Sequence, residues 1–158
     1  MSTKQMKFDT SARQDFEHGV QQIARVVGLT MGPTGRHVVV QKSFGGPTVT
    51  KDGVNVAKEI ELPQPFENVG AKMVNEVAKK VADEAGDGTT TAVVLARAIY
   101  RQGLRHVISG ANAVAVQRGI NDAAVVVGDA INAMAIKCNG RDDLRKVATV
   151  SANQDRVI

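Results

Sequence analysis

The feature that most constrains the fold is a short glycine-rich segment, Gly86–Thr91, between two long stretches of helical apolar periodicity. Its sequence is Gly-Asp-Gly-Thr-Thr-Thr. The two glycines allow a tight turn or a positive φ, and the aspartate between them offers an oxygen ligand for a hard cation. The threonines would lie in the first turn of the next helix, where unpaired backbone amides attract anions. The segment therefore predicts two long helices joined at a site for a metal-bound phosphate.

The same segment has a simpler interpretation. A glycine followed by aspartate and threonine is also an ordinary helix end followed by an ordinary helix N-cap. No Gly-Lys-Ser/Thr sequence follows, so the segment is not a Walker A loop. Taken by itself, it leaves both interpretations open.

Helical periodicity accounts for most of the chain. We expect long helices from about residue 11 to 28, 66 to 85, 89 to 109 and 113 to 134, with a shorter amphipathic helix ending near residue 150. Ser11–Gln14 resembles a capping box, and Asn112 is placed to cap the fourth long helix. One face of the 66–85 helix carries large apolar residues that we expect in the core: Val69, Met73, Val77 and Val81.

Two short strands are predicted between the first two long helices. The stretches 37–42 and 48–51 are rich in valine and threonine, and the turn Phe44–Pro47 separates them. The predicted fold class is therefore mainly α, with long packed helices and one small β-hairpin.

Composition excludes several classes of function. The net charge of +4 comes from 20 basic and 16 acidic residues spread along the chain, and aromatic residues make up only 3%. Nucleic-acid binding would favour a basic stripe and aromatic side chains for stacking. Cys138 is the only cysteine, so neither a disulfide framework nor a thiolate metal site is expected. No stretch resembles a signal peptide or a membrane span, so we expect a cytoplasmic protein without nucleic-acid or membrane partners.

Two further loops share the character of the Gly86–Thr91 segment. One follows the first helix and offers glycine-rich backbone beside a threonine, and the other adds a lysine and an aspartate at the end of a strand. Together these loops closely resemble the N-terminal portion of group I chaperonin subunits of the GroEL type, from about residue 7 to residue 155. The segments that carry the resemblance, in order, are Leu29–Arg36, Lys42–Gly45, Thr50–Gly53, Gly86–Thr91 and Ser151–Asn153.

The resemblance implies a domain organisation and a function. Residues 1–135 would form the N-terminal half of an ATP-binding equatorial domain, and residues 136–158 would begin an intermediate domain. The complete subunit would assist ATP-dependent folding of unfolded proteins in an oligomeric ring, with a lid co-chaperonin as partner. The hairpin at 37–51 and a strand near Lys7 would pair with a neighbouring ring subunit.

The resemblance also implies roles for single residues, with ATP, Mg²⁺ and K⁺ as cofactors. Asp87 would hold Mg²⁺ against the phosphates, and Asp52 would help orient the attacking water as a catalytic residue. The K⁺ ion would be ligated with help from Thr30, Lys51 and Thr90. The nucleotide-binding residues would be Thr30, Met31, Gly32, Pro33, Lys51, Asp87, Gly88, Thr89, Thr90 and Thr91.

The chain departs from the family pattern in two ways. Met31, Thr34 and His37 stand where the family more often has Leu, Lys and Asn, and the missing lysine removes a positive charge near the nucleotide. The family subunit is also several times longer. Its apical domain, its second equatorial half and a second catalytic aspartate have no counterpart in this sequence, so ATP hydrolysis by this chain alone is left open.

Two alternatives remain beside the chaperonin ATPase. The chain could be a truncated or degenerate remnant that at most binds nucleotide weakly or associates with full-length subunits. It could also be a plain helical interaction protein that binds no nucleotide. The three loops would then occur in the chaperonin order by coincidence.

Overall fold

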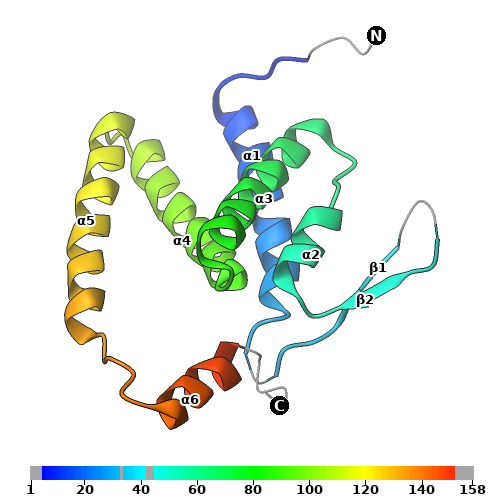
Figure 1. Cartoon of the computed structure of the whole chain (residues 1–158). Coiled ribbons are helices and arrows are strands. Elements are labelled where there is room, and N and C mark those ends of the chain that lie inside the picture. The colour runs from blue at the N-terminus through cyan, green and yellow to red at the C-terminus, as the bar shows by residue number, and fades with distance from the viewer. Residues whose placement is uncertain (1–4, 33, 42–44, 152–158) are drawn as a thin grey trace. The chain divides into compact units, whose positions relative to one another are not determined.

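The computed structural model describes residues 5–32, 34–41 and 45–151 (Figure 1). The fold is mainly helical with one two-stranded sheet, as predicted. The chain divides into two compact units, residues 1–99 and 100–158, and the division falls inside α4. The elements are α1 (Asp9–Gly28), β1 (Val38–Val40), β2 (Thr48–Thr50), α2 (Gly53–Glu59), α3 (Pro65–Ala85), α4 (Thr89–Ile108), α5 (Ala113–Met134) and α6 (Arg141–Ser151).

The first unit is built around a close crossing of α1 and α3. A Cβ atom at Gly19 would overlap the carbonyl oxygen of Glu67, and one at Gly70 would overlap the carbonyl oxygen of Phe16. The two backbones therefore touch only because both positions lack a side chain. Aliphatic side chains of both helices contribute to the core of this unit. Those that are buried are Val20, Ile23, Ala24 and Val27 from α1, and Ala71, Val74 and Ala78 from α3.

The prediction of which face of α3 lies in the core is wrong. Val69, Met73 and Val77 are 50%, 56% and 37% exposed, and Val81 is only half-buried. The buried face instead carries Gly70 and its small neighbours. Because α1 approaches so closely, only the face of α3 with small side chains can pack against it. The face with the larger apolar side chains lies outside this contact and remains mostly exposed.

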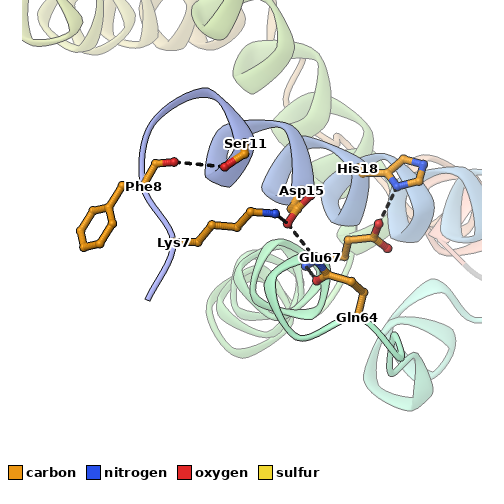
Figure 2. Close-up of polar contacts among 7 residues, drawn as sticks. All are labelled: Lys7, Phe8, Ser11, Asp15, His18, Gln64 and Glu67. Carbon is orange, nitrogen blue, oxygen red and sulfur yellow. Dashed lines mark hydrogen bonds and ion pairs between the residues drawn. The ribbon is translucent and has the colours of Figure 1, made fainter. Parts of the chain in front are cut away.

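The start of α1 also differs from the prediction. The helix begins at Asp9 with Phe8 as its N-cap residue, which makes no side-chain capping bond. The Ser11 hydroxyl donates to the Phe8 carbonyl oxygen at 3.2 Å (Figure 2). Ser11 therefore lies inside the first turn, and the predicted capping box at Ser11–Gln14 does not form.

Asp15 joins three segments near the start of α1 and α3 (Figure 2). Lys7 Nζ donates to Asp15 Oδ2, and Gln64 Nε2 donates to the same oxygen at 2.9 Å. Gln64 also caps α3, because its Oε1 accepts from the Glu67 amide at 2.8 Å. The Lys7 ammonium lies 5.6 Å from the centre of the Phe66 ring. These contacts fix the segment that precedes α1 and the N-terminus of α3 to the same carboxylate.

The side chain of Glu67 makes a second polar link across the crossing. Its Oε1 lies 2.8 Å from His18 Nδ1 (Figure 2). Its Oε2 accepts from Gln22 Nε2 at 3.2 Å. Both partners are on α1, one turn apart, on either side of the Gly19 contact. Glu67 thus contacts α1 through both its backbone and its carboxylate.

The hairpin and the helix that follows it lead toward the predicted site. β1 and β2 are antiparallel, with Val39 opposite Val49 in register. The predicted hairpin is confirmed with shorter strands, and residues 42–44 of its turn lie outside the described residues. The sequence interpretation ended this region at Asp52-Gly53 and missed α2, which begins there.

The second unit contains the end of α4 together with α5 and α6. A Cβ atom at Gly103 would lie 3.7 Å from Val116 Cγ1, so the end of α4 packs on the start of α5. Asn112 caps α5 as predicted, accepting from the amides of Val114 at 2.9 Å and Ala115 at 3.2 Å. No residue of α5, all of which the structure describes, is buried, so its apolar face is exposed. Among the described residues, no helix combines the length and apolar character needed to span a bilayer.

The glycine crossing can be tested by adding a methyl group at either position. Gly19→Ala or Gly70→Ala should lower the free energy of unfolding by about 1–3 kcal/mol, because overpacking at the backbone contact outweighs the gain in helix propensity. Gly119→Ala is the control, because a Cβ atom there meets no atom within 4 Å. It should raise stability by about 0.5–1 kcal/mol. Urea unfolding measures both, and equal effects at all three positions would contradict the crossing.

The link between Lys7 and Asp15 predicts a dependence of stability on pH. The hydrogen bond from Lys7, opposed by burial and assisted by Gln64, lowers the pKa of Asp15 below its ordinary value of 3.8. The stabilising contribution is therefore present above that value and is lost as the pH falls through the lowered pKa of the folded protein. Lys7→Met should raise the pKa of Asp15 and reduce the loss of stability in acid. An NMR titration of the Asp15 carboxyl carbon measures this, with Lys72→Met as control, and an unchanged titration would contradict the link.

Candidate functional site

The three loops singled out in the sequence meet where α1 ends and where α2 and α4 begin. Gly53, the first residue of α2, is buried against Thr90 in the first turn of α4. A Cβ atom at Gly53 would overlap Thr90 Oγ1 and lie 3.2 Å from Cγ1 of Val27, which is itself fully buried. At the next position of α1, a Cβ atom at Gly28 would lie 3.8 Å from Val94 Cγ2 of α4. The N-termini of α2 and α4 and the C-terminus of α1 therefore lie next to one another.

The loop after α1 is held by its own hydrogen bonds. Thr30 is 8% exposed, and its hydroxyl donates to the Val27 carbonyl oxygen at 2.7 Å. The Gly35 amide donates to the Gly32 carbonyl at 2.9 Å, and the Arg36 amide donates to the Leu29 carbonyl at 2.8 Å. The Thr30 hydroxyl is therefore bonded to the helix end, so a ligand would meet mainly the backbone of this loop.

Other residues of this loop face outward. Met31 is 46% exposed, and Gly32 has a φ of 79°, which an L side chain rarely adopts. Pro33, the remaining predicted nucleotide contact of this loop, lies outside the described residues. Met31 and Gly32 are thus both accessible, although the Met31 amide donates to the Gly28 carbonyl at 3.2 Å. Their contact with a nucleotide stays a prediction.

The Gly86–Thr91 segment turns as its glycines predict. Gly86 and Gly88 have φ values of 73° and 81°, and the Gly86 amide donates to the Ala82 carbonyl at 3.0 Å, closing α3. Asp87 between them accepts from the Gly88 amide at 2.6 Å. The bond from the Ala92 amide to the Gly88 carbonyl, at 2.9 Å, starts α4. This geometry places a carboxylate directly before a helix N-terminus.

The three threonines occupy the first turn of α4. Thr89 is 9% exposed, Thr90 is half-buried against Gly53, and Thr91 is exposed. The first amides of a helix have no partner within the helix, and they carry the positive end of its dipole. This turn can therefore bind an anion such as a phosphate group.

Asp52 has a structural role that the sequence interpretation missed. Its Oδ1 accepts from the Val54 amide at 3.3 Å, which makes it the N-cap of α2. Its own amide donates to the Thr50 hydroxyl at 3.0 Å. Lys51, between Thr50 and Asp52 in the sequence, is half-buried. The predicted catalytic carboxylate is thus fixed at a helix start, immediately before the residue that contacts Thr90.

The donor set suits magnesium better than zinc. Among the described residues, no group of three or more His, Cys, Asp or Glu side chains gathers in one place. Mg²⁺ is commonly held by one or two carboxylates, with waters and substrate phosphates completing its shell. Asp87 beside the N-terminus of α4 fits that pattern. The three predicted K⁺ ligands, Thr30, Lys51 and Thr90, lie on the three segments that meet at Gly53.

A protein-family model identifies the family to which this chain belongs. The model of the TCP-1/cpn60 chaperonin family matches residues 23–157. The chain belongs to the TCP-1/cpn60 chaperonin family. The matched range includes α2, the hairpin and all the predicted nucleotide-binding residues of this chaperonin chain.

Solved chaperonin structures have the same fold. A group III chaperonin crystallised in the open state is 31% identical, with a TM-score of 0.78 over 92% of this chain. The chaperonin gp146 from the bacteriophage EL 2 (Pseudomonas aeruginosa), crystallised in the presence of ATP-BeFx, is 29% identical, with a TM-score of 0.77 over 92% of this chain. The chaperonin chain corresponds to part of an equatorial domain and spans 29% and 26% of those two proteins. Its assignment to group I stays a prediction.

The capping role of Asp52 can be separated from its charge. Asp52→Ala should lower the free energy of unfolding by about 1 kcal/mol, because the Val54 amide loses its acceptor. Asp52→Asn keeps an acceptor oxygen at the same place and should change stability by less than about 0.5 kcal/mol. Urea unfolding compares the two variants, and equal losses would mean that the cap contributes nothing.

Proposed function

We propose that this chaperonin chain is the ATP-binding N-terminal portion of a subunit that assists ATP-dependent protein folding in an oligomeric ring. The observation that carries the proposal is the contact between Gly53 and Thr90. It joins the segment containing Lys51 and Asp52 to the first turn of α4, beside the end of α1. Three loops of phosphate-binding character therefore lie together although they are far apart in the sequence.

In this proposal, the first turn of α4 binds the phosphates. The backbone amides of Thr89 to Thr91 and the threonine hydroxyls supply hydrogen-bond donors at the positive end of the helix dipole. Gly88, whose amide donates to Asp87, lies directly before this turn. Asp87 holds the Mg²⁺ ion, which neutralises phosphate charge when it is bound. The exposed residues Met31 and Gly32 lie along the rest of the nucleotide, and Pro33 belongs to the same stretch. Lys51 adds a positive charge beside the phosphates.

Hydrolysis would rest on positioning and charge neutralisation, with no covalent nucleophile. Asp52, held by its capping bond to Val54, accepts a hydrogen bond from the attacking water and orients it. Thr30, Lys51 and Thr90 help to hold a K⁺ ion beside the phosphates, Lys51 through its backbone carbonyl oxygen because its ammonium group has no lone pair. We assign turnover to the complete subunit and nucleotide binding to the residues of this chain.

The hairpin is proposed to pair with a neighbouring subunit of the ring. Val39 and Val49 lie opposite each other in register, and they are 66% and 58% exposed. A two-stranded sheet also offers backbone groups at its edges that a strand of another chain can pair with. The proposal includes unfolded protein clients and a lid co-chaperonin for the complete subunit, a cytoplasmic location, and a change from equatorial to intermediate domain near residue 135.

The proposed function is tested by calorimetric titration of the chain with ATP. Binding should require Mg²⁺, and Asp87→Ala should weaken Mg-ATP binding by about 10–100-fold, because the metal loses its protein carboxylate. Asp129→Ala removes an exposed carboxylate from α5 and should bind as the wild type does. Absence of Mg-ATP binding by the wild type would overturn the proposed function. Wild-type affinity in Asp87→Ala would overturn the metal role of that residue.

A further inference from the structure

Gly53 sits at the contact between the two helix N-termini of the site. It is buried, and α2 begins with it. Besides overlapping Thr90 Oγ1, a Cβ atom at this position would lie 3.3 Å from Thr90 Cβ. It would also lie 3.2 Å from Val27 Cγ1. A methyl group at position 53 would therefore overlap the Thr90 hydroxyl and make a tight contact with Val27.

The neighbours of Gly53 cannot easily move aside. Val27 is β-branched and lies in a helix, where its χ1 angle is restricted. The contact with Thr90 Cβ does not change when the Thr90 side chain rotates, because that atom is bonded to the backbone of α4. Val27 has no exposed surface, so its side chain has no open space to turn into. The simplest relief for an added methyl group is a shift of the backbone at the start of α2, away from α4. Asp52 and Lys51 directly precede Gly53 and would shift with it.

We propose that Gly53 is a positioning residue that sets the spacing between Lys51-Asp52 and the phosphate-binding first turn of α4. The inference rests on the proposed function, because it assumes that Mg-ATP binds at this turn. By lacking a side chain, Gly53 lets the start of α2 contact α4 directly. Groups on both helices can then contact one phosphate chain. Displacement of catalytic groups by about 1 Å can reduce rates by about 100-fold.

The test is the affinity of Gly53→Ala for Mg-ATP, measured by calorimetry under conditions in which circular dichroism shows the variant to be folded. We expect an affinity at least about tenfold weaker than that of the wild type, with unchanged helix content. Gly119→Ala makes the same substitution in α5, where a Cβ atom meets no atom within 4 Å, and should keep wild-type affinity. A folded Gly53→Ala variant with wild-type affinity would overturn the positioning role.

A second variant covers the case in which Gly53→Ala does not fold. Thr90→Ser keeps the hydroxyl but lacks the methyl group, so the hydroxyl can rotate into the vacated position and make room at residue 53. The double variant Gly53→Ala/Thr90→Ser should fold and bind Mg-ATP within about threefold of the Thr90→Ser single variant. If adding Thr90→Ser recovers neither folding nor affinity, the proposal is wrong.

The two proposals fail in different ways. A wild-type chain that binds no Mg-ATP overturns the proposed function. Binding by the wild type, with undiminished binding by Gly53→Ala, overturns only the role of Gly53. A purely structural role would lower the thermal stability of Gly53→Ala while leaving the affinity of the folded protein unchanged, and that result also counts against positioning.

Discussion

The structure of the first unit depends on the backbone contact between α1 and α3 at Gly19 and Gly70. Each glycine faces a carbonyl group of the opposite helix, so the distance between the helices is set by backbone atoms. This distance selects small residues for the buried face of α3. The carboxylates of Asp15 and Glu67 then join the same two helices by hydrogen bonds near the crossing (Figure 2). The crossing thus fixes both the packing and the polar contacts around it.

The candidate site is built on the continuation of the same helix face. Gly19, Ile23 and Val27 are spaced four residues apart, so they lie along one side of α1. The first meets α3 and the last contacts the start of α2 at Gly53, which in turn meets Thr90 of α4. Close approach through glycine therefore occurs at both ends of this face. At one end it packs two helices, and at the other it brings together the loops that we propose bind ATP.

The sequence predicted what depends on local structure. The long helices, the Asn112 cap, the hairpin and the turn at Gly86–Thr91 all follow from periodicity and from residues with strong local preferences. The burial of α3 could not be found in this way, because its most apolar stripe is not the one that meets α1. Helix α2 was missed because Asp52-Gly53 ends a strand and caps a helix at the same point. The available signal was an aspartate that can cap a helix, followed by the apolar residues Val54, Val56 and Ala57.

The sequence by itself determined the helical class, the candidate nucleotide-binding residues and the resemblance to chaperonins. The family match bears out the resemblance, and the nucleotide-binding residues stay a prediction. These conclusions rest on residue types and spacings that act within a few positions of the chain. Only the tertiary structure decided which faces are buried and that Gly53 lies against Thr90. Such contacts depend on the shapes of segments distant in sequence. A glycine that permits close approach looks the same in the sequence as one that ends a strand.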